Sequence, residues 1–149
     1  MTEPIFDHER LDVYRLSIDY VAFSCDLAKT LAGTNRHARD QWLRAAQSIP
    51  LNMAEGNGKH SLKDKNRFFE IARGSALQCA SIHDVLRVCN PITDDANQIG
   101  KSNLKRIVSI LTRLIQRTTG VSEDRIEYEY EYEYEYRVAE YEYEPAAET

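Results

Sequence analysis

The sequence predicts an all-α protein: an up-down-up-down antiparallel four-helix bundle followed by an acidic C-terminal tail. Three observations predict it. Apolar residues recur at helical spacing in four segments between residues 9 and 119, short turns containing Gly, Asn or Pro separate these segments, and no sustained polar–apolar alternation interrupts them. Long helices joined by short connections pack as antiparallel neighbours. We therefore expect one domain over residues 1–121 and a separate tail over 122–149.

The first two helices are expected over about residues 9–31 and 37–54. Gly33 lies in the turn between them, where it can adopt the left-handed conformation that closes a helix. Pro50 lies inside the second helix, where it removes one backbone hydrogen bond and clashes with the carbonyl of Ala46. Because the apolar spacing continues through Pro50, we expect a kink there. The alternative is that Pro50 ends one helix and begins another.

The third and fourth helices carry recognisable end signals. Ser61 is a candidate N-cap with Asp64 three positions later, which is close to a capping box. This helix should run to about residue 89, because the Asn90-Pro91 pair disfavours its continuation. The fourth helix should cover about residues 93–120, and the two acids in its first turn suit the positive end of a helix dipole.

The first helix carries apolar residues on two opposite faces, whereas an ordinary amphipathic helix has one. One face is expected to enter the core, and its members are Leu11, Tyr14, Ile18, Val21, Ala22 and Cys25. The other face, with two outward-pointing residues of the third helix, is expected to join copies of the chain through Leu16, Tyr20, Phe23, Leu27, Leu77 and Val88. Large exposed apolar patches are uncommon on monomers, so we expect a homo-oligomer. The alternative is that the first helix is central within its own bundle.

The tail differs from the rest of the chain in charge and pattern. Residues 123–149 carry 11 acids and 2 bases, so the whole-chain net charge of −5 hides a mildly basic remainder of +4. Glu and Tyr alternate over residues 127–136 and 140–144. Such a segment has high charge density and no partner strand, so we expect disorder. A functional alternative is that this acidic tail occupies a basic surface of the bundle and competes with a polyanion.

No pattern in the chain indicates catalysis. Cys79 and His83 are one helical turn apart and could bind a metal with Cys25, but the favoured interpretation places Cys79 in the core and His83 at its edge. The three cysteines, which also include Cys89, form no CxxC pair and are expected to be buried thiols. We expect no enzyme activity, no metal and no cofactor. Without a signal peptide or a long apolar run, the expected location is the cytoplasm, with no membrane contact.

Basic residues form two groups that could neutralise successive phosphates. The group on the fourth helix comprises Arg106, Arg113 and Arg117, flanked by Lys101 and Lys105. The second group surrounds and follows the turn before the third helix, and comprises Lys59, Lys63, Lys65, Arg67 and Arg73. The alternative is that both groups are ordinary solvated faces. No aromatic platform accompanies them, so contacts to a nucleic-acid backbone are expected rather than base stacking.

Three segments resemble a known family. HERLDVYRLSIDYV, RAAQSIPLNMAEGNGK and RFFEIARGSALQ are similar to the first helix, the kinked second helix with its turn, and the third helix of the 23S ribosomal RNA intervening-sequence proteins. The resemblance covers most of residues 8–119 and implies an up-down bundle that assembles as a homopentamer. Relatives include the accessory variability determinant proteins of diversity-generating retroelements, which bind nucleic acid and partner a reverse transcriptase. The Glu-Tyr tail has no counterpart in the family pattern.

We therefore expect a non-enzymatic homo-oligomer, with a pentamer implied by the resemblance, that binds structured RNA or other nucleic acid through its basic surface residues. The alternative is a protein-interaction scaffold that docks a partner polypeptide and has no direct nucleic-acid role.

Overall fold

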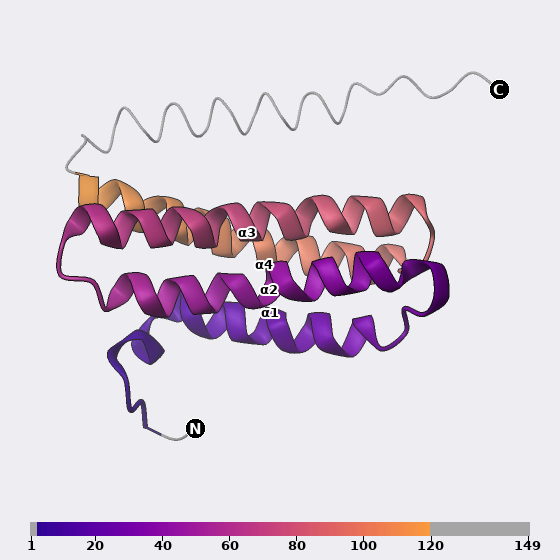
Figure 1. The fold of residues 1–149 in the computed structure, drawn as a ribbon, viewed down its shortest axis with the longest axis horizontal. Helices are drawn as coiled ribbons and strands as arrows, with labels where there is room; N and C mark the ends of the chain where they lie inside the picture. Colours follow the sequence, from indigo (N-terminus) through magenta and orange to yellow (C-terminus); the bar gives the residue numbers. More distant parts are fainter. Residues whose placement is uncertain (1–2, 120–149) are drawn as a thin grey trace, which may run out of the picture.

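The computed structural model describes residues 3–119, which form a bundle of four α-helices (Figure 1). The helices are α1 (Asp12–Ala28), α2 (Arg36–Asn57), α3 (Leu62–Val88) and α4 (Asp94–Thr119), with short 3-10 turns η1 (Asp7–Arg10) and η2 (Gly33–Asn35). The chain reverses direction between consecutive helices (Figure 1). Each helix contacts the next, and α1 also contacts α4, which closes the bundle. The predicted all-α class and four helices are confirmed; the tail, residues 122–149, lies outside the described residues.

The capping residues define three of the helix ends. Ser61 Oγ accepts a hydrogen bond from the backbone N–H of Asp64 at 3.0 Å, and Thr93 Oγ1 accepts one from the N–H of Ala96 at 3.1 Å. Both bonds satisfy a backbone donor that the first turn of a helix leaves unpaired. After α3, Asn90 has a φ of 63° and turns the chain in the left-handed conformation before Pro91. Both end signals of α3 were therefore predicted correctly, and α4 begins at Asp94, within one residue of the expected start.

The second helix continues through Pro50 as one element, so the alternative of two separate helices is wrong. The predicted kink stays a prediction. The first helix is shorter than expected, because the extended backbone of Leu11 separates η1 from α1. At the other end α1 stops at Ala28, and Gly33 adopts a φ of 65° before α2 begins.

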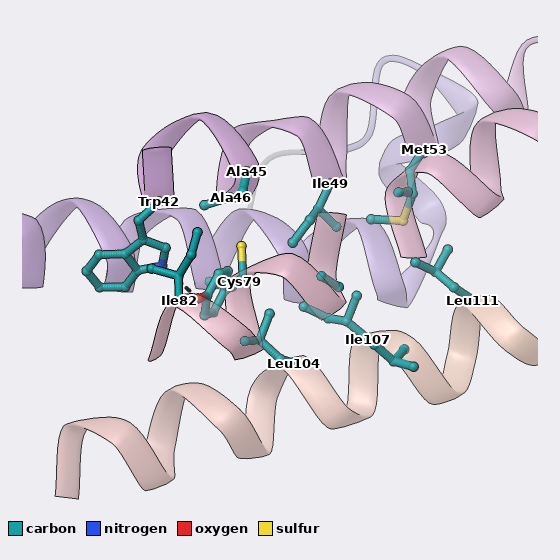
Figure 2. Packing of buried hydrophobic residues seen from close by; sticks show 14 of the residues in the cluster. Trp42, Ala45, Ala46, Ile49, Met53, Cys79, Ile82, Leu104, Ile107 and Leu111 are labelled. Carbon is teal, nitrogen blue, oxygen red and sulfur yellow. Dashed lines mark hydrogen bonds between the residues drawn. The ribbon is translucent and has the colours of Figure 1, made fainter. Parts of the chain in front are cut away.

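The core runs along the axis of the bundle and is built from α2, α3 and α4 side chains packed against α1 (Figure 2). Ala45, Ala46 and Ile49 of α2 are buried in the same core cluster as Ala72, Ala76 and Cys79 of α3. Small residues at this seam allow the two helix backbones to come close, and α2 and α3 share the most extensive contact in the bundle.

The buried face of α1 was not predicted correctly. It consists of Val13, Ser17, Tyr20, Ser24 and Ala28, which matches neither of the two apolar faces. Ser17 Oγ donates to the carbonyl of Tyr14 at 2.6 Å, and Ser24 Oγ donates to the carbonyl of Tyr20 at 2.8 Å. Because each hydroxyl finds a partner on its own helix, these serines are buried without an unsatisfied donor.

Replacing the capping residue of α3 should destabilise the bundle. Ser61→Ala leaves the Asp64 N–H without its side-chain acceptor and should lower the free energy of unfolding by about 1 kcal/mol. Urea unfolding followed by circular dichroism measures the change. Ser102→Ala, at an exposed position inside α4, is the control and should change stability by less than about 0.5 kcal/mol. Equal effects of the two substitutions would contradict the assigned cap.

Candidate functional site

Three arginines of α4 lie on the side of the helix that faces away from the core. Arg106, Arg113 and Arg117 are exposed, whereas Leu104, Ile107 and Leu111 of the same helix are buried (Figure 2). Between residues 96 and 117 the sequence contains five Lys or Arg and no Asp or Glu. We call Arg106, Arg113 and Arg117 the α4 arginine face.

Two of the other predicted basic residues hold α3 and α4 together. Lys101 forms an ion pair with Asp84 of α3, and Arg73 Nε donates to Thr112 Oγ1 of α4 at 2.8 Å. Their side chains therefore have partners within the bundle and are less available to an external ligand than the α4 arginine face. Lys105 is exposed beside Arg106.

The second predicted basic group remains at the surface. Lys59, Lys63 and Arg67 are exposed, and Lys65 is half-buried. The cations of Lys59 and Arg67 lie 5.1 and 5.2 Å from the centre of the Phe68 ring, which attracts them electrostatically. The α2–α3 turn and the C-terminal end of α4 lie at the same end of the bundle (Figure 1). The fold therefore brings part of both predicted basic groups to one end.

Burial separates the predicted interface residues into three kinds. Tyr20 is 0 % exposed, so its assignment to an interface between copies is wrong: its ring lies inside the bundle. Leu16, Phe23, Leu27 and Leu77 are half-buried and pack against the core of their own chain. Val88 is 88 % exposed and available to another molecule.

A different, uncharged surface follows the outer side of α3. Six exposed residues occupy it at alternating intervals of three and four, and none is charged; we call them the outer α3 stripe: Ile71, Gly74, Gln78, Ser81, Val85 and Val88. This heptad spacing is the one by which helices pack against each other in coiled coils. Of these six only Val88 was predicted; Ile71 and Val85 were missed because the Gly, Gln and Ser between them interrupt the apolar pattern.

A hydrogen-bonded cluster inside the bundle involves all four helices. Trp42 Nε1 of α2 donates to the Tyr20 hydroxyl of α1 at 2.9 Å, and this hydroxyl lies 2.7 Å from His83 Nε2 of α3. On α4, a Cβ atom added to Gly100 would lie 2.2 Å from His83 Cε1, so only glycine leaves room for the ring. His83 is therefore fully buried, and its predicted position at the edge of the core is wrong.

Burial keeps the His83 ring neutral. It lowers the pKa of His83 to about 4, an effect that Lys101 reinforces and that Asp84 and Asn97 partly oppose. Trp42 Nε1 can only donate to the Tyr20 hydroxyl, whereas in the bond between this hydroxyl and His83 Nε2 either group can be the donor, according to the tautomer of the ring. Nδ1 and the buried Oδ1 of Asn97 have no hydrogen-bond partner among the described residues.

The cysteines do not form a metal site in the described part of the chain. Residues 3–119 contain no group of three or more His, Cys, Asp or Glu that could hold a metal ion. Burial also raises the pKa of the Cys79 thiol to about 12, which disfavours the thiolate that binds metals. All three cysteines are free thiols, but Cys89 is exposed and Cys25 half-buried, so the expectation of three buried thiols is confirmed for Cys79 only.

A polar groove of about 510 Å³ lies between α2 and α3. Ser48 and Ser75 hydrogen-bond each other there at 2.8 Å, and Asn52 Nδ2 donates to Ser48. Within the described chain neither hydroxyl is hydrogen-bonded to a histidine. The groove is lined by His37, Asp40, Gln41, Arg44, Ala45, Ser48, Ser75 and Gln78.

The fold and the surface define an antiparallel four-helix-bundle protein with a basic end and a basic helix face. Residues 9–113 match the family model of the 23S rRNA-intervening sequence protein, and the chain belongs to this family. Among curated proteins, none matches the sequence.

A solved structure shares the fold. The crystal structure of a protein of unknown function from the S23 ribosomal protein family of Bacteroides thetaiotaomicron is 22% identical in sequence. The match covers 70% of this chain and 98% of that one, with a TM-score of 0.64. In residues 3–119, no helix combines the length and the apolar character needed to cross a membrane.

Lowering the pH from 6.5 to 4 should destabilise the bundle through His83. The pKa of His83 is about 4 in the folded chain, against an ordinary value of 6.5, so in this interval the unfolded chain binds a proton that the folded chain excludes. The stabilisation is complete above pH 6.5 and is lost as the pH falls through about 4. At about 1.4 kcal/mol per pKa unit, the loss is on the order of 3 kcal/mol.

Urea unfolding at a series of pH values measures this loss. His83→Gln should unfold with a weaker pH dependence than the unchanged chain over the same interval. His37→Gln removes an exposed histidine and should keep the original dependence. If His83→Gln and the unchanged chain show the same slope, the assigned burial of a neutral ring is wrong.

Two glycine substitutions test the packing of the same ring. Gly100→Ala places a methyl group against His83 and should destabilise the bundle by about 1–3 kcal/mol, since the ring must move from its hydrogen bond. The methyl group added by Gly74→Ala has no atom within 4 Å outside its own helix. Because Ala favours the helix more than Gly does, this substitution should raise the free energy of unfolding by up to about 1 kcal/mol. Thermal unfolding compares the two variants. A stabilising Gly100→Ala would contradict the close approach.

Proposed function

We propose that this chain is a non-enzymatic bundle protein that binds structured RNA through the α4 arginine face and acts as a homo-oligomer. The observation that carries the first part is the run of five bases without an acid between residues 96 and 117, three of them exposed arginines. Arginine forks bind phosphate groups bidentately and retain their charge at any physiological pH.

The spacing of the arginines supports contact with a nucleic-acid backbone. Arg106, Arg113 and Arg117 share one side of a rigid helix whose opposite side is fixed in the core. Lys59, Lys63 and Arg67 add charge at the end of the bundle where α4 finishes (Figure 1). A rigid row of cations binds phosphates without ordering a loop, so the loss of conformational entropy on binding is small. The family description refers to 23S rRNA, which agrees with RNA as the polyanion.

The outer α3 stripe supports the second part of the proposal. An uncharged heptad stripe that follows most of the length of α3 would be covered by the same stripe of a second copy or by a neighbouring helix of it. The resemblance of the sequence to its family implies five copies. A ring of five would repeat the α4 arginine face and multiply a weak contact through avidity.

The same stripe also favours the alternative function, a scaffold for a partner polypeptide, because an amphipathic helix from another protein could cover it equally well. The oligomeric state distinguishes the two: a chain that remains monomeric leaves the stripe open for a different partner.

Neutralising the α4 arginine face should weaken binding to RNA. Arg106→Gln, Arg113→Gln and Arg117→Gln together should lower affinity for a short RNA duplex, and should reduce the salt dependence by about one unit of slope for each phosphate that the protein no longer neutralises. Fluorescence anisotropy over a series of salt concentrations measures both quantities. The triple variant Arg10→Gln, Arg36→Gln and Arg44→Gln removes the same charge from exposed positions elsewhere and should retain most of the affinity. Equal reductions in affinity for the two variants would remove this face from the proposal.

Placing charge on the outer α3 stripe should dissociate the oligomer. Val85→Glu puts a carboxylate on the stripe, where it would be desolvated against a second copy. Light scattering should show a smaller mass than that of the unchanged chain. Ile99→Glu is the control, because Ile99 is similarly exposed on α4 and should leave the mass unchanged. A monomeric unchanged chain would contradict self-association directly.

A further inference from the structure

We propose that residues 127–136 of the same chain bind the α4 arginine face and compete there with RNA. The proposal rests on the proposed function, since it describes how the same basic surface would be regulated. It is carried by three properties of the chain: opposite charge, matching spacing and a connection of suitable length.

The charges are complementary and belong to adjacent parts of the sequence. The α4 arginine face is exposed, and residues 96–117 of its own helix contain no acid. Residues 127–136 contain five glutamates and no base. When both groups belong to one chain, their association costs no translational entropy. The small free energies of several weak ion pairs can therefore add up to a stable contact.

The spacing of the glutamates suits the spacing of the arginines. In an extended chain, alternate residues point to the same side and lie about 6.7 Å apart, so a segment docked in this conformation would present its five carboxylates in one row. On α4, Arg113 and Arg117 are four residues apart, which corresponds to about 6 Å along the helix, and Arg106 lies about 10 Å further back. Glutamates at every second position can therefore meet all three arginines with a mismatch of only a few ångströms. In a helical conformation the same carboxylates would point in several directions around the helix axis and could not all reach one row of arginines.

The connection permits this contact. Residues 120–126 separate the end of α4 at Thr119 from the alternating segment that begins at residue 127. A connection of this length can span up to about 23 Å and can also close a turn. If the segment ran back along α4, its first glutamates would lie near Arg117 and its later ones near Arg106.

Competition should reduce the apparent affinity for RNA. Each exposed ion pair contributes a factor of about 1.4 to 5 to an equilibrium constant, so three pairs correspond to a docking constant of about 3 to 125. RNA must displace the docked segment, and its apparent dissociation constant rises by roughly the same factor. The docking of the segment and the resulting rise in the apparent dissociation constant should both become smaller at high salt, because salt screens the charges.

Zero-length crosslinking of the full chain tests the contact without RNA. Arg113→Lys supplies an amine that a carbodiimide can join to a nearby carboxylate. Mass spectrometry should find crosslinks from position 113 to glutamates of residues 127–136 at low salt, and these should diminish at high salt. Arg36→Lys is the matched control at the start of α2 and should give no such crosslinks. An absence of crosslinks at position 113, or equal yields at both positions, would overturn the proposal.

Affinity for a short RNA duplex tests the competition. Substitution of Glu127, Glu129, Glu131, Glu133 and Glu135 by Gln should raise affinity at least about threefold more than a control variant of equal charge. The control replaces five exposed acids of the bundle, Glu3, Asp19, Glu55, Glu70 and Asp95, by their amides. If both variants bind RNA equally well, the tail does not compete and the proposed function stands. If crosslinks form but no variant binds RNA, the docking stands and the proposed function fails.

Discussion

One buried hydrogen-bonded cluster determines how the four helices are rotated about their own axes. Tyr20, Trp42 and His83 come from α1, α2 and α3 and share two hydrogen bonds, and Gly100 of α4 lies directly against the imidazole ring. Rotation of any one of these helices would leave a buried polar atom without its partner or drive a backbone into the ring. Both outcomes are costly in an interior that excludes water. Phe23 stacks on the same ring with an angle of 4° between the planes, which adds an aromatic contact from α1.

The rotation of α3 and α4 decides which residues reach the surface. With Gly100 against His83, the side of α4 that carries Leu104, Ile107 and Leu111 faces inward, and the α4 arginine face points outward. With His83 turned into the core, Val85 and Val88 lie on the outside of α3. The exposure of the α4 arginine face and of the outer α3 stripe thus follows from the same buried cluster, although the two surfaces would bind different partners.

The helix ends could be predicted from the sequence because their signals are local. Ser61 and the Asn90-Pro91 pair act within a few residues, and the structure confirms the end that each indicated. The buried side of α1 could not be predicted, because Ser17 and Ser24 count as polar until their bonds to their own helix are known. The predicted interface position of Tyr20 is wrong for a related reason: its hydroxyl partners lie 22 and 63 positions away in the sequence.

The candidate surface was predictable in part. The helical spacing placed Arg106, Arg113 and Arg117 outside, but it could not show that Lys101 and Arg73 are held by Asp84 and Thr112 across the α3–α4 seam. Such partners depend on the register between two helices, which no local pattern contains.

A double-mutant cycle between Tyr20 and His83 tests most directly whether this cluster couples the helices. Tyr20→Phe, His83→Leu and the double variant would be unfolded in urea and their free energies compared. The structure predicts that the two changes are not additive, with a coupling energy of about 1 kcal/mol or more, because each single change strands the other group without its hydrogen bond. Additivity within about 0.3 kcal/mol would contradict the central role of the cluster.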